Sequence, residues 1–488
     1  MSLAVLQVSA ELFPLVKTGG LADVTGALPR ALAAEGVEVR LLLPGFPAFR
    51  ESLTGECAVA PLSLPWGEGR AALLRGRLAG LGDTVVYLLD APGLFERPGN
   101  PYADESGVPY ADNHRRFALL GLAAARLAEG LDSQWMPQLV HAHDWHAALA
   151  CAHLAASRAR RRTLARSIYT VHNLAYQGLF PAHDFCELGL PPELYAVEGL
   201  EFYGQVSFMK AGLHFADAIT TVSPTYAREI QTPEQGCGLD GLLRHRAGVL
   251  HGILNGVDYR VWSPERDRAI AQAYGVARPE GKADCKAALQ RECGLEESSD
   301  APLFGVVSRL TEQKGLPLVL ESLPELLAGG GQLVVLGSGD ARLDAAFADA
   351  AHRHPRQVAR RVGMDEVLAH RIYAGSDVML VPSRFEPCGL TQLYGLSYGA
   401  LPLVHRVGGL ADTVVDCTIE DVAAGTATGF VFNGYSAAEF QRALRRALTL
   451  WRRQEYWTRV RATAMGQRFG WDVAARQYAG IYRSLLQP

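Results

Sequence analysis

Residues 378–392 read VMLVPSRFEPCGLTQ, which is a short apolar run, a turn and the start of a helical pattern. The run Val378–Val381 carries no charge, as expected for a strand buried on both faces of a parallel sheet. Pro382, Pro387 and Gly389 then interrupt regular structure before the helical pattern begins. A strand followed by a tight turn and a helix is the repeating unit of an α/β domain.

The same unit recurs along the whole chain, because short apolar runs alternate with helical patterns. This alternation predicts parallel sheets built from βαβ units. In the first half we expect strands at Ala4–Val8, Val37–Leu43, Thr84–Leu89, Leu139–Ala142, Ser167–Val171 and Ala218–Val222, and a last strand with its turn within Ala247–Asp258. In the second half we expect strands at Leu303–Val307, Gln332–Leu336, Val358–Val362, Val378–Val381 and Leu401–Val404.

The chain has 488 residues, more than one hydrophobic core usually holds, so at least two domains are expected. The sequence is polar and irregular from about residue 258 to 300, between the two sets of strands. We therefore predict an α/β protein of two Rossmann-like, doubly wound parallel-sheet domains, residues 1–257 and 258–465, with a helical C-terminal segment at 466–488. Such sheets bind ligands at the carboxyl ends of their strands, so a cleft between the domains is the expected site.

Composition excludes several classes of function. The net charge of −4 argues against nucleic acid or an anionic membrane as the main partner. No apolar run approaches the length of a membrane span, and the N-terminus has no basic region typical of a signal peptide. Eight cysteines without a C-x-x-C pair favour reduced thiols over a disulfide framework or a zinc site. We expect a cytoplasmic protein.

Almost all basic residues are arginines: only five of the 47 are lysines. A Lys kept in such a chain can mark a place that needs a compact ammonium, although compositional bias explains it equally well. Two of the five lie in motifs that suit phosphate.

The first of these motifs is KTGGLAD, Lys17–Asp23, which follows the first strand. Paired glycines let backbone N–H groups approach an anion, and the helix that follows adds the positive end of its dipole. It is not a P-loop, because Lys17 precedes the glycines. The pentapeptide GGLAD occurs again at Gly408–Asp412, which indicates two related halves, unless each copy is merely a tight strand-to-helix turn.

The second is SRLTEQKG, in which Arg309 and Lys314 follow the strand Leu303–Val307. A guanidinium fork and a point charge suit a diphosphate, and a solvated turn with two unrelated charges is the alternative. The G-x-G of Gly337 and Gly339 lacks the third glycine of a dinucleotide fingerprint, so an ordinary α/β turn is the better interpretation of it by itself.

The opening stretch is the richest in chemistry. Glu386 at a strand end is suited to binding sugar hydroxyls, and Gly389 permits close approach of a phosphate. Cys388 has no partnered His–Asn arrangement, so we interpret it as a small, partly buried thiol and not as a nucleophile.

Histidines gather in HAHDWHA, from His141 to Ala147, and at His172. The spacing of His141 and His143 along a strand, with no further spaced ligand, disfavours a metal site. The D-x-D motif of metal-dependent sugar-nucleotide transferases is also missing. Polar groups at two strand ends instead suit an acceptor with many hydroxyls.

Together, KTGGLAD, HAHDWHA, TVHNLAYQG, NGVD, SRLTEQKG and VPSRFEPCGLTQLYGLSYG resemble the glycogen and starch synthase family, and within it the ADP-glucose-dependent bacterial glycogen synthases. The resemblance covers the whole chain in the right order. It implies the GT-B fold, with a deep cleft between two Rossmann-like domains and a C-terminal helix that crosses back to the first. It also implies a retaining glycosyltransferase that moves glucose from ADP-glucose to the non-reducing 4-hydroxyl of an α-1,4-glucan such as glycogen, without a metal or other cofactor.

The resemblance also assigns residues. Those similar to the family's catalytic groups are Glu386, His172, Arg309 and Lys314. Those similar to its donor-binding groups are Lys17, Gly19, Gly20, Asp23, Asn255, Gly337, Cys388, Gly389, Leu390 and Thr391. Those similar to its acceptor-side groups are Tyr102, Asp144 and Asn173.

Two departures bear on this resemblance. Tyr394 stands where the broader set of retaining GT-B enzymes has a second Glu, which favours the glycogen and starch synthase branch. Met364 stands where many family members have Tyr beside the adenine, and a thioether can still cover a purine. Two alternatives stay open: a GT-B transferase that uses another nucleotide sugar such as UDP-glucose, and a catalytically idle glycan-binding protein. The oligomeric state is not legible in the sequence.

Overall fold

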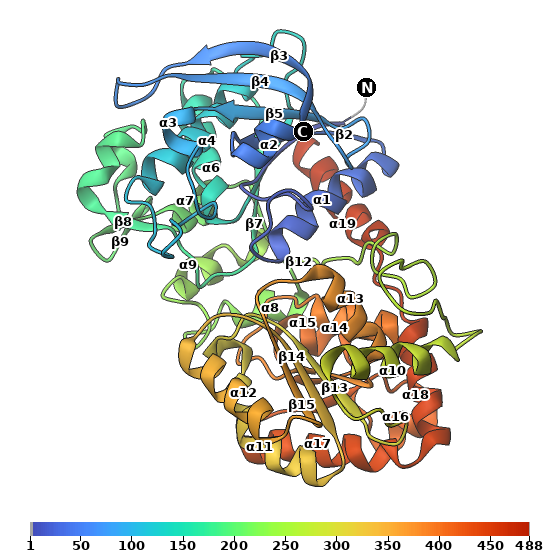
Figure 1. The fold of residues 1–488 in the computed structure, drawn as a ribbon. Helices are drawn as coiled ribbons and strands as arrows, with labels where there is room; N and C mark the ends of the chain where they lie inside the picture. Colours follow the sequence, from blue (N-terminus) through green and yellow to red (C-terminus); the bar gives the residue numbers. More distant parts are fainter. Residues whose placement is uncertain (1–2, 488) are drawn as a thin grey trace. The chain divides into compact units, whose positions relative to one another are not determined.

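A computed structural model describes residues 3–487, which divide into two compact units (Figure 1). The first unit comprises residues 3–256 and 471–487, and the second is Val257–Gly470. The division after Gly256 lies one residue before the boundary drawn from the sequence, and the last helix begins at Trp471. Within residues 3–487, no helix combines the length and the apolar character that crossing a membrane requires.

The first unit is built on a mixed sheet of strand order β12-β11-β7-β6-β1-β2-β5-β4-β3. Its strands are β1 (Leu3–Val8), β2 (Val37–Pro44), β3 (Leu53–Leu62), β4 (Ala71–Leu78), β5 (Val85–Asp90), β6 (Leu139–His143), β7 (Arg166–Val171), β11 (Ala218–Thr221) and β12 (Leu250–Gly252). The sequence predicted a purely parallel sheet, whereas β4 and β3 join its edge as antiparallel strands. Much of β3 is exposed, so it lacks the apolar run that identified the buried strands.

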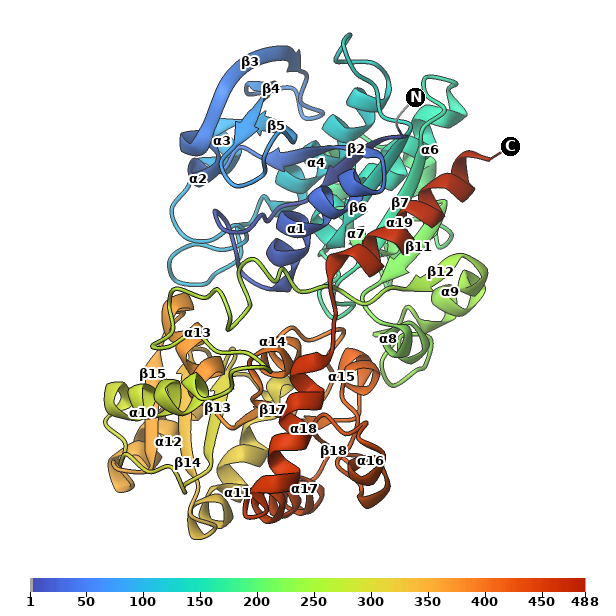
Figure 2. The same cartoon turned by 90° about the vertical axis from the view of Figure 1, so that its right-hand side faces the viewer.

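Helices cover this sheet, and α19 packs beside α1 in the core of the unit (Figure 2). The helices are α1 (Gly20–Ala34), α2 (Pro47–Ser52), α3 (Pro92–Phe95), α4 (Asn113–Ala128), α5 (Asp144–Ala147), α6 (Leu149–Ala159), α7 (Phe208–Phe215), α8 (Pro224–Glu229), α9 (Asp240–His245) and α19 (Trp471–Leu486). A small antiparallel sheet adds β8 (Leu179–Pro181), β9 (Glu201–Phe202) and β10 (Gln205–Ser207). Trp471, Tyr478 and Tyr482 anchor α19 among buried side chains from β1, β2 and α1.

The second unit holds a parallel sheet of order β15-β14-β13-β16-β17-β18. Its strands are β13 (Leu303–Val307), β14 (Gln332–Gly337), β15 (Val358–Val362), β16 (Val378–Val381), β17 (Leu401–His405) and β18 (Phe430–Phe432). Its helices are α10 (Gly281–Cys293), α11 (Leu316–Ala328), α12 (Ala341–Arg353), α13 (Glu366–Gly375), α14 (Thr391–Tyr398), α15 (Gly408–Thr413), α16 (Ile419–Ala424), α17 (Ala437–Trp451) and α18 (Gln454–Gly466). The sequence did not predict β18, whose three residues are too few to show a pattern.

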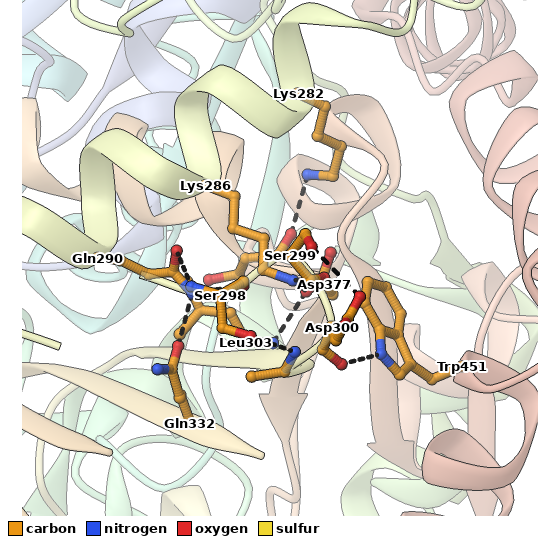
Figure 3. A network of polar contacts seen from close by, with 12 residues as sticks. Lys282, Lys286, Gln290, Ser298, Ser299, Asp300, Leu303, Gln332, Asp377 and Trp451 are labelled. Atoms are coloured by element: carbon orange, nitrogen blue, oxygen red, sulfur yellow. Dashed lines mark hydrogen bonds and ion pairs between the residues drawn. The ribbon is translucent and has the colours of Figure 1, made fainter. Parts of the chain in front are cut away.

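Helix α10 corrects the expectation of an irregular segment from 258 to 300. Its buried face is polar, so the apolar periodicity that marks other helices is missing. Lys282 donates to the carbonyls of Ala374, Ser376 and Tyr398, and Lys286 forms an ion pair of 2.8 Å with Asp377 (Figure 3). These bonds fasten α10 to the ends of α13 and α14 and to the segment that precedes β16.

Candidate active site

In the second unit, three neighbouring strands bring the predicted motifs to one edge of the sheet. Strand β16 lies between β13 and β17, and all three are parallel. Because parallel strands end at the same edge, the segments 308–314, 382–389 and 406–409 are neighbours there. SRLTEQKG, the Glu386 segment and the second GGLAD therefore form one group.

Glu386 lies at the centre of this group and is 7% exposed. Its Oε2 atom accepts hydrogen bonds from Lys314 Nζ at 2.6 Å and from Ser383 Oγ at 2.8 Å. The following helix, α14, has Leu390 at its N-cap and no side-chain cap. The carboxylate is therefore held by Lys314 and Ser383 and does not cap the helix.

Two glycine contacts explain how the backbone allows this arrangement. Gly315 has φ +70°, and a Cβ atom there would lie 1.8 Å from the carbonyl oxygen of Pro382. In the second GGLAD, a Cβ on Gly408 would lie 1.9 Å from the carbonyl oxygen of Glu386. A side chain at Gly315 would push the Lys314 loop away from Pro382, and one at Gly408 would push the second GGLAD away from Glu386. The second GGLAD thus supports the backbone on which Glu386 is mounted.

The turn after Glu386 leads to the start of α14. Gly389 has φ +73°, and Gln392 donates from Nε2 to the carbonyls of Cys388 and Gly389 at 2.9 and 2.8 Å. Cys388 is 3% exposed, which agrees with its interpretation as a small buried thiol. Leu390 and Thr391 bring the first amides of α14 to this turn, the arrangement in which helix starts bind anions.

Arg309 and the G-x-G lie at the ends of the adjoining strands β13 and β14. The Arg309 side chain is exposed, in contrast to the half-buried Lys314. A Cβ on Gly337 would lie 1.9 Å from the carbonyl oxygen of Ser308, and one on Gly339 would lie 2.3 Å from that of Leu310. The close approach of the two loops therefore explains why both positions need glycine, without a bound ligand.

In the first unit, the Lys17 loop leads from β1 into α1. Lys17 Nζ lies 2.9 Å from Asp23 Oδ1, in the first turn of α1. The amides of Thr18 and Gly19 both donate to Oε2 of Glu11, at 2.8 and 3.3 Å. Part of the predicted anion-binding backbone is therefore engaged by a carboxylate that the sequence did not single out.

Strands β6 and β7 are parallel neighbours and place two histidines together. His143 Nδ1 lies 3.1 Å from His172 Nε2, at the carboxyl ends of these strands. Burial lowers the pKa of His172 to about 3 and holds the pKa of His143 well below its ordinary value. Burial thus favours the neutral form of both rings, and their contact holds the two rings in a fixed relation.

Asp144 and Tyr102 lie beside these strand ends. Asp144 is buried with φ +59°, and burial, with a smaller contribution from Glu11, raises the pKa of its carboxyl well above the ordinary range. Tyr102 donates from its hydroxyl to Glu11 Oε1 at 2.6 Å and stacks on His146 at 4.6 Å between ring centroids. An acid in the left-handed region marks a backbone held against its preference, as functional sites often require.

Asn173 and Asn255 are the remaining predicted residues of this unit. Asn173 is half-buried, and its Oδ1 accepts from the amide of Ala175 at 3.0 Å. Asn255 is 6% exposed, and its Oδ1 atom has no hydrogen-bond partner among the described residues. A buried amide oxygen without a partner is available to an external donor.

Each unit therefore gathers its own set of predicted residues, and each set includes residues that the sequence did not identify. Ser383, Gln392 and Glu11 hold predicted residues in place. The first two lie within a few residues of Glu386, so proximity was an available signal. Glu11 carried none, because its role depends on a fold that brings Tyr102 to it.

The two departures also have structural settings. Tyr394 is 7% exposed and stacks on Trp262 at 4.0 Å, so the position of the second Glu is filled here by packing. Met364 is 74% exposed, next to exposed Val362. Among residues 3–487, no group of three or more His, Cys, Asp or Glu side chains has the arrangement of a metal site.

Comparisons with known proteins match both units to described families. Residues 4–245 match the family described as "Starch synthase catalytic domain", and residues 294–461 match "Glycosyl transferases group 1". The chain is 59% identical to the glycogen synthase of Variovorax paradoxus (strain S110) over 489 residues, and 55% identical to that of Francisella tularensis subsp. novicida (strain U112) over 485 residues. Each match covers 99% of both chains.

Solved structures of similar fold include a member of the same family. The catalytic domain of starch synthase IV from Arabidopsis thaliana, bound to ADP and acarbose, superimposes with a TM-score of 0.90 at 31% identity and 99% coverage of both chains. A sucrose-phosphate synthase from Thermosynechococcus elongatus shares the fold, with a TM-score of 0.60 at 16% identity and the same coverage.

Proposed function

This chain belongs to the glycogen and starch synthase family of GT-B glycosyltransferases, and we propose that it transfers glucose from ADP-glucose to the non-reducing 4-hydroxyl of an α-1,4-glucan, with retention at the anomeric carbon. The observation that carries the proposal is the contact of Lys314 and Ser383 with Glu386 beside the start of α14.

Positive groups that suit the donor diphosphate lie in each of the two units. Arg309 and Lys314 lie after β13, at the same edge of the sheet as the turn that leads into α14, and Lys17 lies in the loop before α1. These groups suit an anion that gains charge as the glycosidic bond breaks. Removing a single donor of this kind typically costs about 3 kcal/mol of transition-state stabilisation.

Glu386 is assigned to the glucose hydroxyls of the donor. Lys314 and Ser383 both bind its Oε2 atom, and its buried position fixes the remaining oxygen. A carboxylate fixed in this way orients a sugar by accepting hydrogen bonds. His172, whose Nε2 atom lies 3.1 Å from His143 Nδ1, is assigned to the donor glucose on the family resemblance.

The residue types also suggest how retention is achieved. The leaving diphosphate oxygen is on the face of the sugar that the acceptor hydroxyl approaches, and it can accept the proton of that hydroxyl. The new bond then forms on the face from which the old one left, with no nucleophile from the protein. This route suits a site in which Cys388 is buried and Tyr394 replaces the second Glu.

The acceptor is assigned to the first unit, at the carboxyl ends of β6 and β7. Tyr102, Asp144 and Asn173 offer an aromatic ring and polar atoms there, as a chain of glucose units requires. The related Arabidopsis structure is bound to ADP and acarbose. We extend both ligand classes to this chain as donor product and acceptor.

The choice of adenine over uracil rests on the similarity to that structure and on Met364. An exposed thioether at this position can cover a purine face. No metal is proposed, because the charge of the diphosphate is assigned to Lys17, Arg309, Lys314 and helix starts.

The decisive experiment measures incorporation of labelled glucose into glycogen from ADP-glucose and from UDP-glucose side by side. We expect ADP-glucose to be preferred by a large factor, and NMR of the extended glucan to show only α-anomeric protons. Preference for UDP-glucose would contradict the proposed donor and identify a GT-B transferase that uses another nucleotide sugar. Binding of glycogen without incorporation from either donor would identify a glycan-binding protein instead.

A further inference from the structure

Glu11 is the point at which the Lys17 loop and Tyr102 meet. Its Oε2 accepts from the amides of Thr18 and Gly19, and its Oε1 accepts from Thr18 Oγ1 at 2.5 Å and from Tyr102 Oη at 2.6 Å. The side chain is 3% exposed. Four donors thus converge on one buried carboxylate, two from the backbone and two from hydroxyls.

The backbone of Glu11 is itself held from two sides. Its carbonyl oxygen accepts from Thr25 Oγ1 on α1 at 2.6 Å and from Ser9 Oγ at 3.1 Å, and its amide donates to Ser9 Oγ at 3.2 Å. Ser9 directly follows β1. The backbone of Glu11 is therefore held by the end of β1 and by α1, and this fixes the point from which its carboxylate reaches the loop.

A carboxylate is the side chain best suited to this place, because it accepts four hydrogen bonds and donates none. A glutamine would turn its NH₂ group toward two of the donors. The side chain of Asp144 lies close enough for the charge of Glu11 to contribute to the raised pKa of Asp144. Glu11 therefore touches both groups that the proposed function separates, the phosphate loop and the acceptor side.

We propose that Glu11 is a positioning residue that holds the Lys17 loop and Tyr102 as one unit, so that the backbone around the donor phosphate and the ring on the acceptor side keep a fixed relation. The inference rests on the proposed function. The inference goes beyond the proposed function because it assigns a role to Glu11, which acts through Thr18, Gly19 and Tyr102. One consequence is that the Thr18 and Gly19 amides are used to hold the loop in its conformation. Within this loop, phosphate binding is then left to Lys17 and the amides that begin α1.

The test compares Glu11→Gln, Tyr102→Phe and the double variant with the wild-type enzyme. Tyr102→Phe removes one hydroxyl and keeps the ring that stacks on His146. Glu51→Gln, at an exposed position at the end of α2, serves as the matched control. Measured for each are kcat, KM for the donor, KM for the glucan and the melting temperature.

We expect Glu11→Gln to lower kcat about tenfold or more and to raise both KM values, since loop and ring lose their common support. Tyr102→Phe should raise mainly the KM for glucan. The double variant should be no worse than Glu11→Gln alone, because the two residues act as a unit. Glu51→Gln should match the wild type.

Three results would overturn the inference. The first is a lowered melting temperature with kinetic constants unchanged, which would make Glu11 merely structural. The second is multiplication of the two single effects in the double variant, which would make the residues independent. The third is a change in only one of the two KM values with Glu11→Gln. A wild-type enzyme without turnover would instead contradict the proposed function, so the two failures are distinguishable.

Discussion

Lys314 Nζ lies 2.6 Å from Glu386 Oε2 and joins the loops that follow β13 and β16. The lysine side chain is 21% exposed and the glutamate side chain 8%, so the pair is largely removed from water. Such a pair is sensitive to the loss of one partner, because the other is left buried and uncompensated. It also leaves the second carboxylate oxygen of Glu386 in a fixed position, which is the basis of the first prediction.

Replacing Glu386 by Ala should lower kcat by about two orders of magnitude, on the order of 3 kcal/mol, because the donor glucose loses its fixed acceptor. Binding of ADP should change much less, since Arg309 and the start of α14 remain. Steady-state kinetics and calorimetric titration with ADP on one preparation check both statements.

Glu386→Gln is the matched control, because it keeps the shape and one acceptor oxygen but removes the charge that Lys314 faces. It should be intermediate in kcat. Near-normal turnover of Glu386→Ala together with a lowered melting temperature would show that the residue supports the fold alone.

The second prediction concerns Ser383, whose hydroxyl shares Oε2 of Glu386 with Lys314. Ser383→Ala removes one of two hydrogen bonds and leaves the ion pair, so kcat should fall by about tenfold or less. Ser383→Thr retains the hydroxyl and should restore most of the loss. Equal loss in both variants would show that Ser383, which is fully buried, matters for packing and not for positioning Glu386.

Much of the fold was predictable because most of its strands are short and predominantly apolar. Strands β13, β15 and β16 begin and end at the predicted residues. The errors have physical causes. Strand β3 is exposed at the sheet edge and α10 buries lysines and a glutamine, so neither shows the apolar pattern on which the prediction depends.

The candidate site was predictable to a similar extent. Lys314, Glu386 and Gly389 share a short motif or follow neighbouring strands, so parallel topology alone brings them to one edge. Glu11 could not be found in this way, since Tyr102 reaches it from a distant part of the chain. The conspicuous scarcity of lysine was informative: Lys17, Lys286 and Lys314 form ion pairs, and Lys210 and Lys282 donate to backbone carbonyls.

The third prediction is that turnover survives chelation. The diphosphate is assigned to Lys17, Arg309, Lys314 and helix starts, so no step requires a divalent cation. Rates measured after dialysis against EDTA should equal those of the untreated enzyme. A loss of activity that magnesium or manganese restores would contradict this assignment.

The fourth prediction concerns stability alone and uses the buried pair Lys286 and Asp377. Both side chains are less than one-tenth exposed, and Asp377 also accepts from the amide of Leu303 at 2.9 Å. Lys286→Met should lower the free energy of unfolding by about 3 kcal/mol, because a carboxylate is left buried without its ammonium.

The control is the ion pair of Arg476 and Asp472 on α19, which is mostly exposed. Arg476→Ala should cost no more than about 0.5 kcal/mol. Both variants are compared by urea denaturation. If Lys286→Met unfolds at the same urea concentration as the control, the polar network of α10 does not stabilise the second unit.

The last prediction is a loss of stability in mild acid. Burial lowers the pKa of several histidines of the first unit to about 3, namely His141, His146, His153 and His172. In the unfolded chain these rings titrate near pH 6.5, so between that pH and about 3 the unfolded state binds more protons than the folded state. Stability is therefore fully present above pH ~6.5 and falls as the pH is lowered.

His153 tests this best, since it lies on α6 away from the candidate site and is 4% exposed. Between about pH 7.5 and 5.5 a single such histidine lowers the free energy of unfolding by about 1.4 kcal/mol, and His153→Gln should remove that part of the pH dependence. The wild-type protein supplies the reference pH dependence for this comparison. Urea denaturation at the two pH values measures both differences, and identical pH dependence in wild type and His153→Gln would mean that the ring takes up its proton without unfolding.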